Sequence, residues 1–592
     1  MNLFSDIRAL VIESLAAMQA EGALPAGLDM TNVAVEPPRD AAHGDMATNA
    51  AMVLAKPAGQ NPRAIAEALA AKLGADPRIV TAEVAGPGFL NLRLTRDAWR
   101  GVVAAALARG RDFGRSDLGQ GVRVNVEFVS ANPTGPLHVG HGRGAAFGAS
   151  LAGLLEARGS RVHREYYVND NGRQMDILAT SIWLRYLELT GISLPFPENG
   201  YQGDYVYTVA RELRQVQGDR LRRSAPEVIA DLPPDQGQGG DPEAHIDALI
   251  ARCKALLGED AYGNLFDVGL NAILGDIKDD LSEFGVHFDT WYSERSLATA
   301  GNIERAIARL REGDHVYTSD DGAVWFRASA LGDEKDRVII RSNGQSTYFA
   351  SDIAYLWDKF ERGFERAIYV FGADHHGYVA RLHAAGRGLG LDSARIEVLL
   401  VQFAVLYRGE TRIPMSTRAG EFVTLRQLRE EVGSDACRYY YVMRSNDQHL
   451  DFDLELAKAH SRENPVYYVQ YAYARIAAVF RQLVERHLVH NRSAGDAARN
   501  RLVHEAELDL MNVLMRYPEV VEHATRSRAP HQVANYLRDL AQSLHAYYDG
   551  SEQRILCDDD DLRHARLSLL LATQQVLANG MSLLGVSARE SM

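Results

Sequence analysis

Apolar residues occupy every second position of 122–128 and give the clearest strand pattern in the chain (Val122, Val124, Val126, Phe128). Proline and glycine at 132–136 end this strand. The segment that follows, 138–159, is rich in small residues and predicts a helix. A second strand is expected over 162–168 and a second helix over 175–190. This order of strands and helices predicts an α/β domain built on a sheet.

The first 112 residues predict a small α/β domain of their own. A helical apolar stripe runs through Phe4, Ile7, Leu10, Val11, Leu15 and Met18. Asn61 and Pro62 are typical of a helix cap and a first helical residue, so a helix is expected over 63–73. The last apolar alternation of this region predicts a strand (Leu90, Leu92, Leu94). A module that serves packing alone is the alternative to a functional domain.

Residues 191–290 interrupt the alternation of strands and helices. The segment 224–245 is rich in Pro, Asp, Gln and Gly and predicts an exposed linker. Helical patterns follow at 246–257 and 272–284. We interpret 191–290 as an insertion between two halves of a sheet, with an ordinary surface excursion as the alternative.

Strand patterns return at 316–327, where Asp321-Gly322 is a hairpin turn signal, and at 367–371. Polar blocks lie at 347–352 and directly after the second of these strands, at 372–377. Ligands in open α/β sheets bind at the carboxyl ends of strands. A lone Asp or His there is usually a cap or a turn residue, but several polar blocks at strand ends predict a site.

From residue 465 to the C-terminus, apolar residues recur at spacings of three and four, which predicts an all-helical region. Three of its aromatic residues, Tyr468, Tyr471 and Tyr473, could stack on unpaired bases, although the core of a helix bundle is the alternative for most of them. The acidic run 558–561 is more typical of the first turn of a helix than of a binding site.

The composition narrows the class of protein. A chain of 592 residues is too long for one core and predicts three or four domains. The net charge of −14 counts against a nucleic-acid partner without excluding a local basic face, and by itself it favours a metabolic enzyme. The three cysteines are far apart, so neither structural zinc nor a disulfide framework is expected. No signal peptide or membrane span is expected, so the default location is the cytoplasm.

His138 and His141 are the first candidates for chemistry. They lie three residues apart at the start of the predicted helix 138–159, so they share one helix face, and Gly140 between them leaves room for a flat ring. A helix N-terminus with two imidazoles beside it is suited to binding phosphate. A solvated polar pair and half of a metal site are the alternatives, but no third Cys or His ligand is nearby.

The segment 131–141, ANPTGPLHVGH, resembles the HIGH signature of class I aminoacyl-tRNA synthetases in the form found in arginyl-tRNA synthetases. The likeness extends to YVNDNGRQ at 167–174 and to GDMATNAAMVLAK and GPGFLNLRL before residue 95. The resemblance implies an α/β fold with a Rossmann-type parallel-sheet catalytic domain over 113–464 and an insertion at about 191–290. It also implies a small N-terminal α/β domain over 1–112 that contacts tRNA, and an all-α anticodon-binding domain over 465–592.

The same resemblance implies a function. ATP with Mg²⁺ would activate L-arginine to arginyl-adenylate, and arginine would pass to the 3′ end of tRNA(Arg), with activation that depends on bound tRNA. A cytoplasmic monomer with no membrane contact and no structural zinc is expected. Two rivals remain open: an enzyme with the same ATP signature but no tRNA, such as a nucleotidyltransferase or an amino-acid ligase, and a non-catalytic tRNA-binding paralogue.

Site residues follow from the resemblance position by position. The HIGH region comprises Ala131, Asn132, Pro133, Thr134, Gly135, Pro136, Leu137, His138, Val139, Gly140 and His141. The arginine-binding residues would be Glu127, Ser130, Ala131, Asn132, His141, Tyr348, Asp352 and His375. The ATP-binding residues would be His138, Gly140, His141, Asp374, Met415 and Ser416. Catalysis would rest on His138, His141 and Arg418.

Two of these assignments depart from the family pattern. His375 stands where many relatives have glutamine, and Pro414 and Thr417 occupy the lysine positions of the second class I signature. What supplies charge to the phosphates there stays open. Asp352, four residues after Tyr348, suits the planar fork of a guanidinium, but it could instead cap a helix beginning at Ile353.

Overall fold

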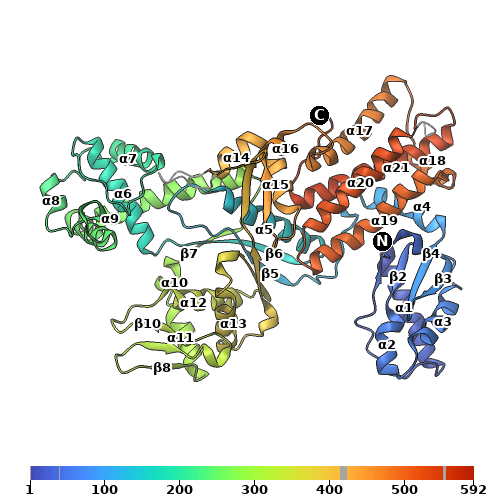
Figure 1. Ribbon diagram of the computed structural model, residues 1–592, viewed down its shortest axis with the longest axis horizontal. Coiled ribbons are helices and arrows are strands. Elements are labelled where there is room, and N and C mark those ends of the chain that lie inside the picture. Colours follow the sequence, from blue (N-terminus) through green and yellow to red (C-terminus); the bar gives the residue numbers. More distant parts are fainter. Residues whose placement is uncertain (1, 39, 414–422, 551–554) are drawn as a thin grey trace. The chain divides into compact units, whose positions relative to one another are not determined.

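The computed structural model describes residues 2–38, 40–413, 423–550 and 555–592 (Figure 1). The chain divides into two compact units. One comprises 1–120, 153–159 and 459–592, and the other comprises 121–152 and 160–458. We describe each unit by itself.

The second unit is built on a five-stranded parallel sheet. Its strands lie in the order β12-β11-β5-β6-β7. Their bounds are β5 (Arg123–Glu127), β6 (Arg161–Val168), β7 (Thr290–Ser293), β11 (Arg366–Gly372) and β12 (Ile396–Val401). The strands predicted at 122–128, 162–168 and 367–371 are confirmed. The strand order reverses between β5 and β11, as in dinucleotide-binding folds, so a ligand site is expected at their carboxyl ends.

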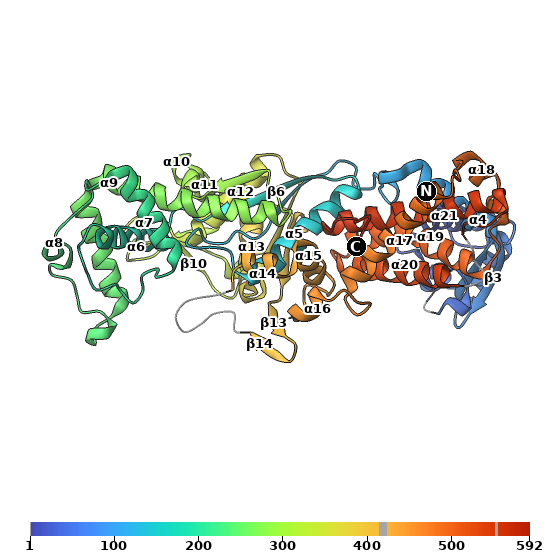
Figure 2. The same ribbon diagram turned by 90° about the horizontal axis from the view of Figure 1, so that it is seen from above.

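Helices connect and cover these strands. They include α5 (Val139–Ala157), α6 (Arg173–Leu189), α10 (Arg295–Thr299), α11 (Asn302–Glu312), α12 (Tyr348–Glu361) and α13 (Tyr378–Gly388). Figures 1 and 2 place α11, α12 and α13 together, and their apolar faces join the core that also holds Tyr369 of β11. The small residues of α5 let it approach the sheet closely: Gly148 lies directly against the ring of Phe128.

The insertion differs in part from the sequence prediction. It contains α7 (Asp204–Gln217), α8 (Ala225–Ile229) and α9 (Pro242–Glu283). The expected linker 224–245 is wrong over its first residues, because Ser224 and Glu227 form a capping box that starts α8. The two helices expected at 246–257 and 272–284 are parts of α9, which is broken at Gly258 by a φ of 76°.

Two small sheets complete this unit. The strand region predicted at 316–327 is an antiparallel hairpin outside the parallel sheet, and Gly322 of its turn has a φ of 83°. Its sheet comprises β8 (Val316–Thr318), β9 (Val324–Phe326) and β10 (Arg337–Ile340). The other sheet comprises β13 (Ala404–Arg408), β14 (Thr411–Ile413) and β15 (Leu450–Asp453), and α14 (Leu425–Val432), α15 (Ser434–Val442) and α16 (Leu454–Lys458) accompany it.

The N-terminal part of the first unit is the expected α/β module. Its antiparallel sheet has the order β1-β2-β4-β3, with β1 (Val35–Glu36), β2 (Met46–Thr48), β3 (Ile79–Ala85) and β4 (Phe89–Leu94). Its helices are α1 (Leu3–Ala20), α2 (Ala50–Ala58), α3 (Pro62–Leu73) and α4 (Arg96–Arg109). The predicted cap is confirmed, since the Asn61 side chain accepts the Arg63 N–H at 2.8 Å.

The C-terminal part of the first unit is the predicted helical region. It consists of α17 (Pro465–Glu485), α18 (Arg492–Ala497), α19 (Glu505–Arg526), α20 (His531–Asp549) and α21 (Asp560–Leu584). Asp559 caps α21, so the acidic run starts a helix as expected. In the part of the chain that the structure describes, α21 alone has the length and hydropathy of a membrane span, and 67% of that window is buried in the protein.

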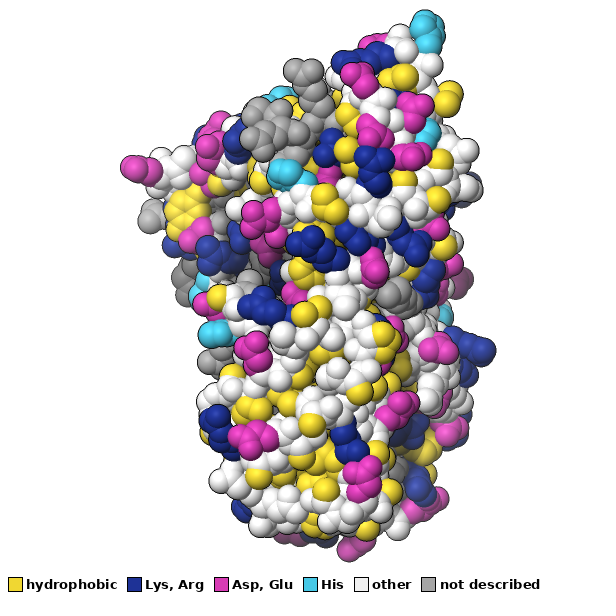
Figure 3. Space-filling view, turned by 90° about the vertical axis from the view of Figure 1, so that its right-hand side faces the viewer, with side chains coloured by type: hydrophobic (Ala, Val, Ile, Leu, Met, Phe, Trp, Pro, Cys, Tyr) yellow, Lys and Arg dark blue, Asp and Glu magenta, His cyan; other side chains and the backbone are white. Residues whose placement is uncertain are grey.

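One face of the molecule mixes both signs of charge. On the face drawn in Figure 3, Lys and Arg side chains are interspersed with Asp and Glu. The net charge of −14 is therefore compatible with basic positions on this face.

Two glycines of α5 give a matched test of how closely this helix packs on the sheet. A methyl group at Gly148 would fall on the ring of Phe128, whereas one at Gly144 would meet nothing within 4 Å. We expect Gly148→Ala to lower the free energy of unfolding by about 1–3 kcal/mol through overpacking. Gly144→Ala should leave it unchanged or raise it by up to about 1 kcal/mol. Urea denaturation of both variants measures this difference, and equal stabilities would contradict the packing described.

Candidate functional site

A cavity of about 320 Å³ lies at the carboxyl ends of β5 and β11, where the strand order reverses. This volume falls in the range of small-molecule sites. Five of the predicted arginine-binding residues line it: Glu127, Ser130, Tyr348, Asp352 and His375. Residues that are more than 240 positions apart in sequence thus line the same cavity.

His138 and His141 stack at the start of α5, with ring centroids 3.7 Å apart. The backbone N–H of Gly140 donates to Nδ1 of His138 at 3.1 Å, and the N–H of His138 donates to Nδ1 of His141 at 3.2 Å. An Nδ1 that accepts a hydrogen bond carries no proton, so each neutral ring has its proton on Nε2. Local backbone geometry therefore selects the tautomer.

Burial keeps this histidine pair neutral. It lowers the pKa of His138, and burial together with the neighbouring His138 lowers the pKa of His141 to about 3. At neutral pH, His141 is thus an uncharged donor at the N-terminus of a helix.

The chain leaves β5 in a strained conformation. Val129 has a φ of 67° and Ser130 a φ of 41°, values that non-glycine residues rarely adopt. The strain turns Ser130 so that its hydroxyl donates to Glu127 at 3.3 Å and accepts from the N–H of Tyr167 at 3.1 Å. Such strain costs about 1–3 kcal/mol per residue and is concentrated at functional sites.

Asn132 is exposed at the rim of this loop. Its side chain donates to Gln174 at 2.7 Å and accepts from Asn169 at 3.2 Å. Both partners belong to the segment 167–174. This segment is therefore joined to the HIGH region through side-chain amides.

Asp352 does not cap a helix. The cap of α12 is Thr347, whose side chain accepts the N–H of Ala350, and Asp352 lies more than one turn further along. The capping alternative is therefore wrong. Tyr348 and Asp352 are one turn apart and face the same cavity, where Tyr378 donates a hydrogen bond to Asp352.

Besides Glu127 and Asp352, the cavity holds a third carboxylate, which the sequence did not predict. Glu294 lines it and is only 3% exposed. Burial and the charge of Asp170 raise the pKa of Glu294 to about 7, and burial with Glu294 and Glu127 nearby raises that of Asp352 to about 8. Neither carboxylate forms an ion pair within the described ranges of the chain, although the charge of Arg381 partly offsets the rise in the pKa of Asp352. The missed signal was that Glu294 directly follows a strand, β7, which lay at the edge of the presumed insertion.

Glu127, by contrast, has a cationic partner. Nζ of the fully buried Lys359 lies 2.6 Å from Glu127 and 2.9 Å from the side-chain oxygen of Asn125. Lys359 also lies 3.8 Å from Glu165, which Arg362 clamps with two hydrogen bonds of 2.6 and 2.8 Å. Glu127 therefore has a cationic partner at hydrogen-bond distance, whereas Asp352 and Glu294 have none within ion-pair distance among the described residues.

Several predicted residues do not line the cavity. Asp374 is exposed and lies 3.6 Å from His375 in an ion-pair geometry. Ala131 is buried, with its carbonyl accepting the Tyr166 hydroxyl, and the carbonyl of Thr134 accepts that of Tyr205. The predictions for Met415, Ser416 and Arg418, together with Pro414 and Thr417, lie outside the described residues.

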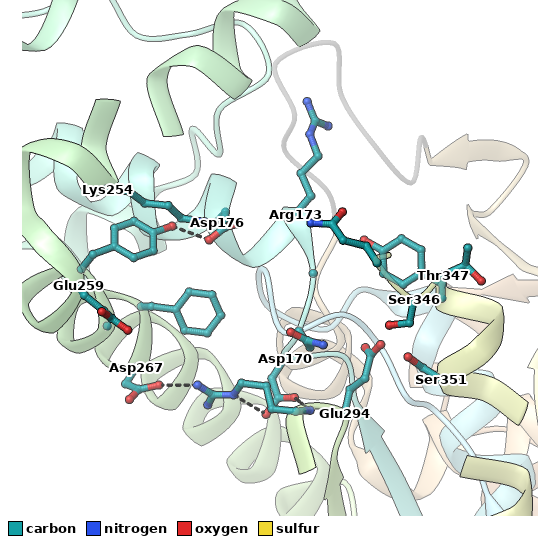
Figure 4. A pocket seen from close by; sticks show the side chains of 18 of the residues that line it. Asp170, Arg173, Asp176, Lys254, Glu259, Asp267, Glu294, Ser346, Thr347 and Ser351 are labelled. Atoms are coloured by element: carbon teal, nitrogen blue, oxygen red, sulfur yellow. Dashed lines mark hydrogen bonds and ion pairs between the residues drawn. The ribbon is translucent and has the colours of Figure 1, made fainter. Parts of the chain in front are cut away.

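A larger cavity of about 970 Å³ adjoins the first, between α9 and the start of α12. The two share Glu294 and Tyr348. Figure 4 shows Glu294 beside Ser351 at the wall of the larger cavity. Ion pairs line its far side, where Arg295 lies 3.0 Å from Asp267. Among residues 2–38, 40–413, 423–550 and 555–592, no group of three or more His, Cys, Asp or Glu is arranged to hold a metal ion.

Three family models match successive parts of the chain. The arginyl tRNA synthetase N terminal domain matches residues 5–94. The catalytic domain of class I (R) tRNA synthetases matches 102–193 and 276–459, and the DALR anticodon binding domain matches 469–592. The gap in the catalytic match contains α7, α8 and most of α9.

The chain is similar over its whole length to bacterial arginine–tRNA ligases. That of Thioalkalivibrio sulfidiphilus is 57% identical over 587 residues, which cover 99% of this chain and 100% of that protein. That of Halorhodospira halophila is 56% identical, with 99% of each chain covered. The solved arginyl-tRNA synthetase of Thermus thermophilus covers 100% of both chains with a TM-score of 0.75, and at 23% identity it supports the fold alone.

The neutral state of His141 can be tested by titration. Because its pKa is lowered to about 3, we expect its ¹³Cε1 signal to stay constant between pH 5 and 8 in protein labelled at histidine. The signal is assigned by its loss in His141→Gln, and a histidine peptide in the same buffers provides the titrating reference. A midpoint for His141 between pH 5.5 and 7.5 would contradict the tautomer and burial described here.

Proposed function

The chain belongs to the class I arginyl-tRNA synthetases, and from that premise we propose which of its residues perform each part of the reaction. It is a ligase that activates L-arginine with ATP, forming arginyl-adenylate and diphosphate, and transfers the arginine to the 3′ end of tRNA(Arg). The observation that carries the proposal is the cavity at the ends of β5 and β11, with its two uncompensated carboxylates.

Asp352 and Glu294 receive the guanidinium group. A guanidinium is planar, permanently charged and carries five N–H donors, so it matches carboxylates that have no other cation. Tyr348, at the mouth of the same cavity, offers a hydroxyl to a further nitrogen. The ammonium of lysine has one nitrogen and cannot engage two separated carboxylates with the same geometry.

The other end of arginine lies toward β5. Glu127 is already neutralised by Lys359, so its remaining acceptor capacity suits an α-ammonium without attracting a guanidinium as strongly. Ser130 and Asn132 project from the loop directly after β5, and we assign both to the α-groups of the substrate. His375, at the end of β11, closes this wall of the cavity.

The phosphates of ATP lie at the N-terminus of α5. Helix amides and the Nε2–H of His141 donate to oxygens on which negative charge builds in the transition state. His138 and Gly140 complete this surface, and Asp374, at the end of β11, is assigned to the ribose. ATP brings Mg²⁺ as part of the substrate complex. Met415, Ser416 and Arg418 are assigned to the phosphate side by the sequence pattern alone.

The chemistry then requires no covalent enzyme intermediate. A carboxylate oxygen of arginine attacks the α-phosphorus of ATP, and diphosphate leaves. A ribose hydroxyl at the 3′ end of tRNA next attacks the carbonyl carbon of the adenylate, and AMP leaves. The protein contributes orientation and donors for developing charge, which are the main sources of rate in such a reaction.

We assign tRNA binding to the parts that flank the catalytic domain. We propose the boundaries 1–112, 113–464 and 465–592, a monomer, and a location in the cytoplasm. In the C-terminal part, Tyr471 is 38% exposed and stacks with Tyr467 at 5.9 Å, while Tyr468 and Tyr473 are half-buried. None of these rings is fully buried in the helical core, which supports a role in stacking on unpaired bases.

The dependence of activation on tRNA is tested by ATP–diphosphate exchange. Proline and threonine replace the lysines of the second signature, so we expect an active site that is incomplete without tRNA. Exchange should be negligible with each of twenty amino acids alone, and should appear with arginine once total tRNA is added. Full exchange with arginine and ATP alone would refute this dependence. An unchanged rate in Arg418→Ala would show that Arg418 does not supply phosphate charge.

Guanidinium recognition is tested by the pH dependence of arginine binding. With pKa values of about 8 and 7, Asp352 and Glu294 hold protons at neutral pH that they must release to bind a cation. Arginine affinity should therefore rise by about ten-fold or more from pH 6.5 to 8.5, and calorimetry in buffers of different ionisation enthalpy should detect the released protons.

Asp352→Asn is the matched variant for this experiment. It leaves Glu294 as the one titrating carboxylate of the pair, so proton release should shrink. The kcat/KM for arginine, measured with tRNA present, should fall by about 10²–10⁴-fold, because a buried charge loses its partner. The KM for ATP should change little. A folded variant with near-normal use of arginine, or an affinity independent of pH, would overturn the assignment.

A further inference from the structure

The backbone of the HIGH segment is paired with a segment nearly 290 residues away. The N–H of Val139 donates to the carbonyl of Val423 at 3.1 Å, and the N–H of Leu425 donates to the carbonyl of Leu137 at 2.8 Å. His138 and Thr424 thus face each other in an antiparallel bridge. The position of the His138 backbone is therefore set by the start of α14.

The start of α14 is itself firmly organised. Thr424 caps the helix through a capping box with Gln427, whose side chain accepts the N–H of Thr424 at 2.9 Å. The side chains of Leu425 and Leu428, near the start of α14, are buried. A displacement of α14 must therefore move residues 423–425 with it, because the cap joins them to the first turn.

Arg426, in this first turn, joins α14 to α9. Its Nε donates to Asp280 and its Nη2 to Asp276, both at 2.7 Å. Asp276 and Asp280 are one turn apart on the last part of α9, so one planar guanidinium bridges two carboxylates. Asp280 is buried but Arg426 is partly exposed, so water screens this contact in part. Arg429, one turn further along α14, also lies 3.8 Å from Asp280 and contacts Glu283, so two arginines join α14 to α9.

α9 holds two other parts of the site as well. Near its start, Glu243 and Asp247 each lie 2.6 Å from Arg173, which belongs to the segment 167–174 that contacts Asn132. In its middle, Lys254 and Tyr262 bind Asp176 of α6 at 2.9 and 2.6 Å. Figure 1 shows the last part of α9 running from the insertion toward α14. The helix thus connects the insertion with the HIGH backbone.

We propose that Arg426 is a positioning residue for ATP activation, which holds the His138 backbone in register through α14 and transmits the position of α9 to it. This inference rests on the proposed role of His138 at the phosphates. Arg426 does not touch substrate. It does not line the cavity assigned to the guanidinium and contacts α9 instead, so its loss should affect turnover and not the recognition of arginine.

The test compares Arg426→Gln with a control that contacts the same helix. Arg408, the last residue of β13, lies 2.7 Å from Glu431 near the other end of α14 and 2.8 Å from Glu455 of α16. It has no ion pair with α9 among the described residues, so Arg408→Gln removes ion pairs of similar exposure without touching the link to α9. We expect Arg426→Gln to lower kcat for tRNA-dependent exchange by about 10–100-fold with the KM for arginine within two-fold, since small misplacements at a reaction centre have effects of this size. Arg408→Gln should change neither constant by more than about two-fold.

Further variants separate positioning from loss of folding. Arg426→Lys keeps the charge but offers one nitrogen for two carboxylates, so it should restore part of the lost kcat. Asp280→Asn should lower kcat as well, and the double variant with Arg426→Gln should lose less than the product of the two single losses. Equal losses of kcat in Arg426→Gln and Arg408→Gln, or full additivity with Asp280→Asn, would overturn the proposal.

Hydrogen exchange supplies a readout that does not depend on activity. The amides of Val139 and Leu425 should exchange faster in Arg426→Gln than in Arg408→Gln, and unchanged protection would overturn the inference. The role of His138 is checked separately by His138→Gln. If that variant keeps its kcat while Arg426→Gln exposes the two amides, the assignment of His138 fails and the structural link through α14 stands.

Discussion

A buried charge network beneath the cavity determines how this site is built. Lys359 of α12 and Arg362, the residue directly after α12, meet Glu127 of β5 and Glu165 of β6, and Tyr355 donates to Glu165 at 2.7 Å. Burial alone would raise the pKa of Glu165, but the hydrogen bonds from Arg362 and the charge of Lys359 hold it at about 2. Removing one member of such a network leaves an uncompensated buried charge, which costs about 3–5 kcal/mol. The network therefore secures α12 to the centre of the sheet.

Because of this network, the carboxylates that line the cavity are of two kinds. Glu127 is compensated from below by Lys359, whereas Asp352 and Glu294 depend on the arriving ligand for their positive charge. An empty site keeps protons on these two groups, and a permanent cation displaces them. Under the proposed assignment, specificity for a guanidinium follows from the difference between Glu127, which Lys359 compensates, and the pair Asp352 and Glu294, which form no ion pair among the described residues, since negative charge alone would attract any cation.

The proposed phosphate site at the start of α5 depends on neutral hydrogen-bond donors and not on charged side chains. His138 and His141 are neutral because they are buried and stacked, and their tautomer is determined by backbone amides. A neutral donor at a helix N-terminus stabilises developing charge without holding the diphosphate product as strongly as a fixed cation would. Backbone strain at Val129 and Ser130 serves the same site, because it directs the chain from β5 into this loop. Backbone geometry and burial thus prepare the proposed phosphate site, as carboxylate charge prepares the proposed guanidinium site.

The amino-acid sequence by itself determined many of the elements. The pattern from Ala131 to His141 is the basis of the proposed phosphate site. Apolar periodicity predicted β5, β6, β11 and the C-terminal helices, Asn61 was a cap as its side chain indicated, and the acidic run 558–561 starts a helix as predicted. These are local properties, since a cap or a strand depends on a few neighbouring residues.

Only the tertiary structure decided which side chains share a wall. Glu294 was missed, Asp352 could still have been a cap, and Lys359 and Arg426 drew no notice, because long-range pairing leaves no local pattern. The compensation of Glu127, and its absence at Asp352, arise from strand order and helix packing, which bring together charges separated by up to 232 residues. Burial and mutual distance set the charge state of each group, and neither can be read from the residues around it.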